Sequence, residues 1–153
     1  MRRRPASTVS IAAGNRSLLD QGGHVQELAP PECRRLLEST SVGRLGYCTE
    51  QGPRIVPMNY ALVGDILTFR TGPNTEASWH AIFQEVAFEV DAIDVVRHTG
   101  WSVLVVGKAE LLEATSLQML DLSQMPHPWA GGERSIVAQL SLAHITGRRV
   151  DPA

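Results

Sequence analysis

The stretch RIVPMNYALVGDILTFRT, residues 54–71, has the pattern of a β-hairpin. Apolar residues recur through 54–63 and again through 66–71, as in half-buried strands. Gly64-Asp65 between the two runs is a two-residue hairpin turn signal. Pro57 has no backbone N–H to donate, so it indicates an edge or a bulge in the first strand.

The chain on either side of this hairpin predicts four more strands and a few short helices. Pro30-Pro31 suits a helix entry, and the spacing of Leu28, Leu36 and Leu37 gives that helix an apolar face. The further strands are expected over 42–49, 85–93, 101–113 and 135–150, and the further helices over 75–83 and 115–124. Six strands without regular β-α-β alternation predict a mainly β protein, an antiparallel barrel with a few short helices.

Length and charge limit the classes of protein. The 153 residues suit one domain, which we expect over 26–153 after a disordered tail at 1–25. A net charge of −2 gives no basic field, so neither nucleic acid nor a membrane is expected as a partner. The apolar stretch after Arg2-Arg3-Arg4 is too short and polar for a signal-peptide core, so a cytoplasmic location is expected.

Residues that could bind a metal are scattered. Cys33 and Cys48 form no CxxC pair, and the five histidines show no HxH or HxxxH spacing. We therefore expect no metal site, and we expect the two cysteines to be thiols of a reducing compartment.

The segment after the hairpin resembles an anion cradle. Gly72-Pro73-Asn74 turns the chain between a strand and the start of a helix, where backbone N–H groups can bind phosphate. Glu76 lies in the first turn of that helix, where an anion site would favour a cation.

The ordered segments together resemble a known family. They are VGRLGY (42–47), RIVPMNY (54–60), GDILTFRT (64–71), AFEVD (87–91), GWSVLVVGKAE (100–110) and ITGRR (145–149). This order is similar to the pyridoxamine 5′-phosphate oxidase-like, FMN-binding split-barrel family, in its actinobacterial, nitroimidazole-reductase-like branch. The resemblance covers roughly residues 28–150.

The resemblance implies a six-stranded split barrel that forms a homodimer, with two FMN molecules between the subunits. It implies that the isoalloxazine ring is bordered by Arg54, Ile55, Val56, Pro57, Met58 and Asn59. Arg70 and Thr71 would face the phosphate, with Asn74 and Thr75 as neutral donors, and Trp101 and Ser102 would approach the flavin from another strand.

Each of these residues also has a purely structural interpretation. Residues 54–60 could be an edge strand with Asn59 in water, and Arg70 could pair with Glu76 or Asp65. Trp101 could be a partly buried core residue or a dimer anchor.

One position departs from the family pattern. Relatives commonly place a serine-lysine pair in the turn, and the lysine binds phosphate; here Thr75 and Glu76 stand there. Reversing that charge near a dianion changes the Coulomb energy by roughly 5 kcal/mol at most. Tight FMN binding then requires compensation by Arg70, Arg54 or the other subunit.

Two classes of function follow. The leading hypothesis is a flavin-dependent oxidoreductase with FMN and a small-molecule substrate; no acid-base pair marks a catalytic residue. Pyridoxamine phosphate is disfavoured as the substrate because only Arg148-Arg149 provide charge near the C-terminus. The alternatives are a reductase that uses the deazaflavin F420 and a cofactor-poor dimer that binds or senses a small molecule.

Overall fold

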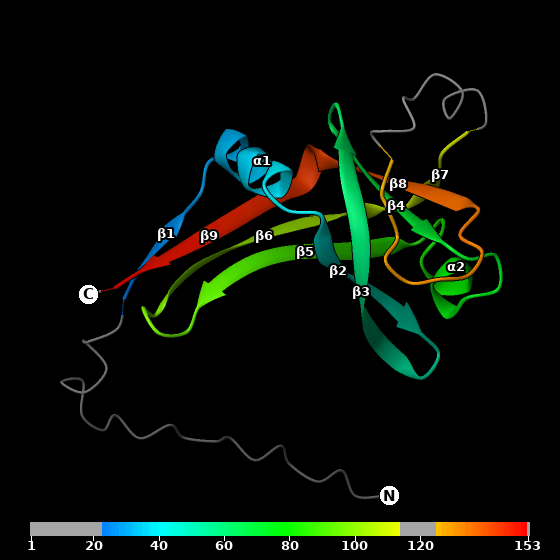
Figure 1. Cartoon of the computed structure of the whole chain (residues 1–153), viewed down its shortest axis with the longest axis horizontal. Coiled ribbons are helices and arrows are strands. Elements are labelled where there is room, and N and C mark those ends of the chain that lie inside the picture. The colour runs from blue at the N-terminus through cyan, green and yellow to red at the C-terminus, as the bar shows by residue number, and fades with distance from the viewer. Residues whose placement is uncertain (1–22, 114–124, 153) are drawn as a thin grey trace, which may run out of the picture.

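A computed structural model describes residues 23–113 and 125–152 (Figure 1). Within them, nine antiparallel strands form one curled sheet in the order β1-β9-β6-β5-β2-β3-β4-β8-β7. The predicted helix 115–124 and nearly all of the predicted tail lie outside the described residues.

The elements follow one another along the chain with short connections. The strands are β1 (His24–Glu27), β2 (Val42–Thr49), β3 (Gly52–Val63), β4 (Ile66–Thr71), β5 (Glu85–Asp94), β6 (Thr99–Lys108), β7 (Glu110–Leu111), β8 (Ile136–Ser141) and β9 (Ile145–Asp151). The helices are α1 (Pro30–Glu38), α2 (Glu76–His80) and a 3-10 helix (Leu142–His144). The predicted mainly β, antiparallel class is confirmed.

The predicted number of six strands is wrong for the described part of the chain. β1 is an additional strand, and it pairs with β9. The predicted strand 101–113 breaks at Ala109, whose N–H and C=O bond to Gln84 and Phe83, before β7 crosses to β8. The predicted C-terminal strand is interrupted by the 3-10 helix, where the Ser141 hydroxyl accepts from the N–H of Ala143.

The hairpin behaves as its sequence predicts. β3 and β4 are antiparallel, with Val63 opposite Ile66, and Gly64 at φ 59° makes the two-residue turn. A positive φ there favours glycine, since a Cβ would be strained.

β3 divides its length between two neighbours. Gly52–Asn59 pairs with β2, whereas only Tyr60–Val63 pairs with β4. β4 then diverges and pairs with β8, so the sheet opens beside the first eight residues of β3. This opening splits the curled sheet.

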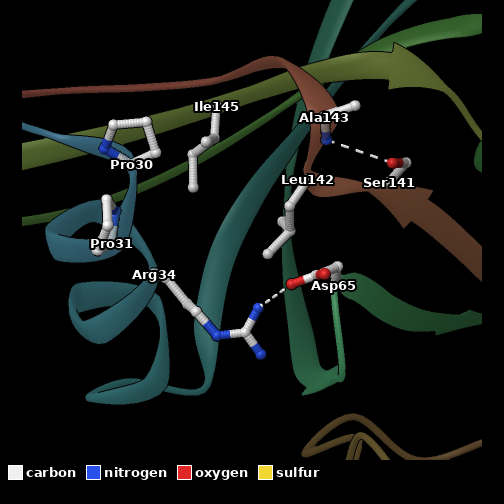
Figure 2. A pocket seen from close by; sticks show the side chains of 8 residues that line it. All are labelled: Pro30, Pro31, Arg34, Asp65, Ser141, Leu142, Ala143 and Ile145. Atoms are coloured by element: carbon white, nitrogen blue, oxygen red, sulfur yellow. Dashed lines mark hydrogen bonds and ion pairs between the residues drawn. The ribbon is translucent and has the colours of Figure 1, made fainter.

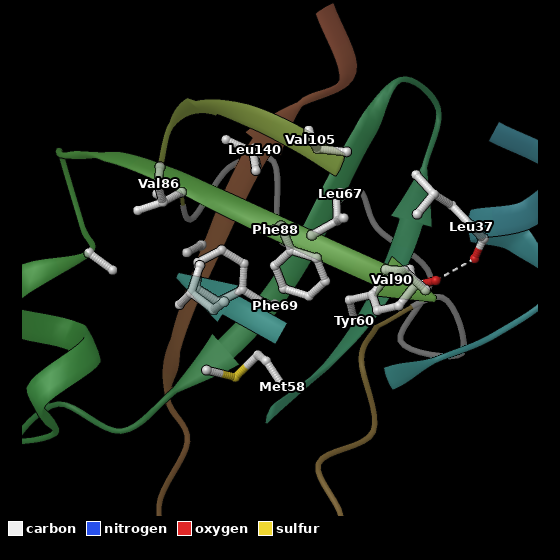
Figure 3. Packing of buried hydrophobic residues seen from close by; sticks show 14 of the residues in the cluster. Leu37, Met58, Tyr60, Leu67, Phe69, Val86, Phe88, Val90, Val105 and Leu140 are labelled. Carbon is white, nitrogen blue, oxygen red and sulfur yellow. Dashed lines mark hydrogen bonds between the residues drawn. The ribbon is translucent and has the colours of Figure 1, made fainter. Parts of the chain in front are cut away.

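The core fills the concave side of the sheet (Figure 3). Phe88 on β5 is fully buried, with its ring centroid 5.3 Å from Tyr60 and 6.1 Å from Phe69. The Tyr60 hydroxyl donates to the carbonyl of Leu37 at 2.7 Å, which ties α1 to this aromatic cluster. Burying three aromatic rings supplies a large part of the hydrophobic stabilisation.

Helix α1 begins at Pro30, as predicted, and packs its buried face on β9. Cys33 and Leu37 are fully buried, and Gly147 of β9 leaves room for them. A Cβ at Gly147 would lie 2.6 Å from the Cys33 sulfur. Among the described residues, α1 is not long and apolar enough to cross a bilayer, and neither is any other helix.

We predict that Gly147→Ala destabilises the protein by about 1–3 kcal/mol, because the new methyl group overpacks the α1–β9 contact. Combining it with Cys33→Ala should recover about 1 kcal/mol relative to the sum of the single changes. Urea unfolding of the two single variants and the double variant measures this coupling. Strict additivity would contradict the steric cause.

Candidate functional site

The unpaired edge of β3 is the main candidate for a ligand contact. Gly52–Asn59 bonds to β2 on one side, and no other described strand pairs with it on the opposite side. On this segment Ile55 is 72 % exposed and Pro57 is exposed, while Val56 packs against the core. Backbone groups that point away from β2 are therefore available to a planar ligand with its own donors and acceptors.

A loop over residues 125–135 covers one end of this edge. The backbone N–H of Trp129 donates to Asn59 Oδ1 at 3.0 Å, so the oxygen predicted to serve a flavin holds the loop instead. Beneath the loop lies a cavity of about 50 Å³, lined by Pro57, Met58, Asn59, Arg70, Pro128, Ala130 and Arg134. Four predicted site residues thus come together: Pro57, Met58, Asn59 and Arg70.

Arg70 lies in this cavity with a partner that the sequence did not indicate. Its Nε donates to the carbonyl of Arg134 at 2.9 Å. The structural alternative, pairing with Glu76 or Asp65, is wrong, because Asp65 pairs with Arg34 and Glu76 pairs with Arg54. Arg134 was missed because its stretch reads only as a loop; its charge near the last strands was the single available signal.

Glu76 is held in a small charged cluster. Its carboxylate lies 3.5 Å from Arg54 Nε and accepts from the Tyr47 hydroxyl at 3.1 Å. Tyr47 and Arg54 are cross-strand neighbours on β2 and β3, so the sheet places both beside the start of α2. Burial, and then the hydrogen bond from Glu76, raise the pKa of Tyr47. Arg54 therefore neutralises the unfavourable acid rather than remaining free for a ligand.

The predicted anion cradle uses its own hydroxyls internally. Thr75 caps α2, with its hydroxyl accepting from the N–H of Ser78 and lying 2.7 Å from the Thr71 hydroxyl. Gly72 faces the carbonyl of Glu133, which would be 2.8 Å from a Cβ at that position. Asn74 is exposed in the turn. Internal capping and a nearby carbonyl oxygen make this turn a poor phosphate site.

Trp101 and Ser102 lie in a different place from the other predicted residues. Both line a cavity of about 390 Å³ on β6 and β9, together with His98, Arg148 and Val150. Trp101 is half-buried against the core, in line with its structural interpretation. Within one chain, these two residues share no cavity with Arg54 or Arg70.

A larger cavity of about 510 Å³ lies between α1, the β3–β4 turn and the 3-10 helix (Figure 2). Its walls are mainly apolar, and Arg34 reaches across it to Asp65. Arg34 also bonds to Glu38 and to the carbonyl of Gly64. Because carboxylates already neutralise this cation, we give more weight to the smaller cavity at Arg70 as a site for an anion.

Metal-binding residues do not gather in the part of the chain that the structure describes. No group of three or more histidine, cysteine, aspartate or glutamate side chains there could hold a metal ion. Cys33 and Cys48 are free thiols, and burial raises the pKa of the Cys33 thiol.

Comparison with known proteins agrees with the sheet topology and the split beside β3. A family model described as pyridoxamine 5′-phosphate oxidase matches residues 29–149, which is most of the chain. The chain belongs to the pyridoxamine 5′-phosphate oxidase family. Its resemblance to the flavin-binding split barrels is thereby confirmed.

Relatives of this pyridoxamine 5′-phosphate oxidase family member span nearly its whole length. The uncharacterized protein Rv0080 of Mycobacterium tuberculosis is 30 % identical over 146 residues, covering 92 % of this chain and 95 % of its own. The FAD-binding protein of Mycobacterium smegmatis is 29 % identical at a TM-score of 0.64, with 82 % and 98 % covered. A candidate 5-nitroimidazole antibiotic resistance protein of Bacteroides thetaiotaomicron, 16 % identical with 84 % and 90 % covered, shares the fold at a TM-score of 0.66.

We predict that Tyr47 ionises above its ordinary pKa of 10.0, because burial and Glu76 both oppose the phenolate. The folded-state pKa is raised, so the stabilisation is complete below about pH 10 and is lost as the pH rises through the folded-state value. The difference in tyrosinate absorbance between the wild type and Tyr47→Phe reports this titration.

In Glu76→Gln the pKa of Tyr47 should decrease but stay raised, since burial is the larger cause. Ionisation of Tyr47 at or below its ordinary value in the wild type would contradict the cluster.

Proposed function

We propose that this chain binds FMN at the open edge of β3 and acts as a cytoplasmic, flavin-dependent oxidoreductase on a small-molecule substrate. The observation that carries the proposal is the unpaired backbone of Gly52–Asn59, next to the cavity that contains Arg70. A flavin requires both features: a ring edge that exchanges hydrogen bonds, and a phosphate that needs cations.

The described residues fit such a cofactor in part. Ile55 and Pro57 offer an exposed apolar surface for the ring face, and the β3 backbone offers hydrogen bonds. The helix cradle does not fit the phosphate, because Thr71 and Thr75 bond to each other and Glu76 lies beside them. The phosphate must therefore be held elsewhere, and Arg70 is the predicted cation that the structure leaves outside any described ion pair.

Similarity supports the flavin class. The Mycobacterium smegmatis relative, at 29 % identity over nearly all of its length, is an FAD-binding protein. When bound, a flavin supplies the redox chemistry, while the protein orients it and shields it from water.

The outer face of the sheet suits a second copy. Ile55, Ala87 and Val106 lie in neighbouring positions across β3, β2, β5 and β6, and Ile55 and Val106 are exposed. The Arg44–Glu89 pair borders this apolar row at 2.9 Å. We propose that a homodimer covers this face and brings Trp101 and Ser102 of one subunit towards the β3 edge of the other. An apolar centre with a charged border is typical of such interfaces.

A second candidate is a dimer that binds a small molecule without a flavin. The internal capping of Thr75 and the acid at Glu76 favour it, because both weaken the expected phosphate site.

A flavin titration separates the two candidates. FMN, FAD, riboflavin and F420 are added to the purified protein, and quenching of cofactor fluorescence measures each affinity. Micromolar or tighter binding of FMN, followed by reduction and reoxidation of the bound flavin, would support the oxidoreductase. Absence of binding by every flavin would leave the small-molecule dimer.

We predict that Ile55→Asp abolishes FMN binding and dimerisation with little effect on monomer folding, because Ile55 is 72 % exposed in one chain. Val96→Asp in the β5–β6 turn is the matched control, since Val96 is 86 % exposed and outside the site. Light scattering after gel filtration and FMN titration measure the two effects. An Ile55→Asp variant that remains a dimer and binds FMN normally would contradict the proposed use of this face.

A further inference from the structure

Two arginines from distant parts of the sequence line the small cavity under the 125–135 loop. Arg70 comes from β4 and Arg134 from the residues before β8, which pairs with β4. Arg70 Nε binds the carbonyl of Arg134, so the two residues are held together by the backbone. Neither takes part in the seven ion pairs of the described residues.

Arg134 carries an unexplained polar atom. Its Nε is buried and has no hydrogen-bond partner. A buried donor on a charged group is seldom left without an acceptor in a native protein, so it indicates a missing ligand or ion. The nearest acid in sequence, Glu133, accepts from the Ser135 hydroxyl at 2.9 Å.

The size of the cavity selects the ligand. About 50 Å³ is far below the roughly 300–1,000 Å³ of pockets that enclose a whole small molecule. It has room for a single tetrahedral anion, and Asn59 adds a side-chain amide to its wall. Guanidinium groups bind phosphate oxygens in a forked geometry, so two of them suit one phosphate dianion.

We infer that Arg70 and Arg134 form a phosphate-binding subsite, and that it replaces the helix cradle as the anchor of a phosphomonoester. The identification of that ester as FMN depends on the proposed function, whereas the anion site itself does not. FMN suits the subsite better than FAD, because a terminal phosphate can enter a closed cavity and a phosphate bridging to adenosine cannot. The inference also accounts for Glu76: its pairing with Arg54 is harmless if the phosphate lies elsewhere.

The test compares FMN with riboflavin, which lacks only the phosphate. In the wild type FMN should bind more tightly, and Arg134→Gln should lower FMN affinity by about 10- to 100-fold while riboflavin affinity stays unchanged. Arg134→Lys should fall between them, since it keeps the charge and loses the fork. Arg35→Gln, which removes the same charge from the exposed side of α1, should have no effect.

Three outcomes would overturn the inference. Arg134→Gln could leave FMN affinity unchanged, or it could weaken FMN and riboflavin equally. Glu76→Lys could increase FMN affinity relative to riboflavin by more than Arg134→Gln decreases it, which would place the phosphate at the start of α2.

Inorganic phosphate separates this inference from the proposed function. If neither flavin binds the wild type, the flavin proposal fails, and calorimetric titration with phosphate still tests the subsite. Phosphate binding that is lost in Arg134→Gln and kept in Arg35→Gln would support the two-arginine site as a site for free phosphate. Absence of phosphate binding together with absence of flavin binding would overturn it.

Discussion

β3 bonds to two different neighbours along its length, and the rest of the structure depends on this division. Its first part pairs with β2 and its last part with β4, so one sheet turns into two half-sheets around the buried rings of Tyr60, Phe69 and Phe88. A strand fully paired on both edges would close the barrel and leave no free backbone. The division therefore supports the core on one side and creates the open edge on the other.

Ion pairing decides which charges of the site can serve a ligand. Arg34 and Arg54 lie near cavities or the open edge, yet each is neutralised by a carboxylate, Asp65 and Glu76 respectively. Both pairs are partly exposed, so they contribute little to stability. Their effect is on the electrostatic potential: positive charge without a paired acid is concentrated at Arg70 and Arg134 instead.

Local patterns predicted the fold better than the site. The hairpin, the Pro30 helix entry and the antiparallel class depend on turn chemistry and alternation within a few residues, which the sequence displays. The break at Ala109 and the pairing of β1 depend on hydrogen bonds to distant strands, for which no local signal exists. Glu76 was recognised as a departure, but its pairing with Arg54 requires the β2–β3 register. Arg134 lies 64 residues from Arg70, and only the folded chain brings them together.

The contact between Cys33 and Gly147 has a consequence for how the family can vary. The helix and the strand meet where a thiol occupies the space that a side chain on β9 would need. Across relatives, a residue larger than glycine at position 147 should therefore occur only with a smaller residue at position 33. The two positions should drift as a pair, and a chain that changes one alone would have to move α1 away from the aromatic cluster that Leu37 anchors.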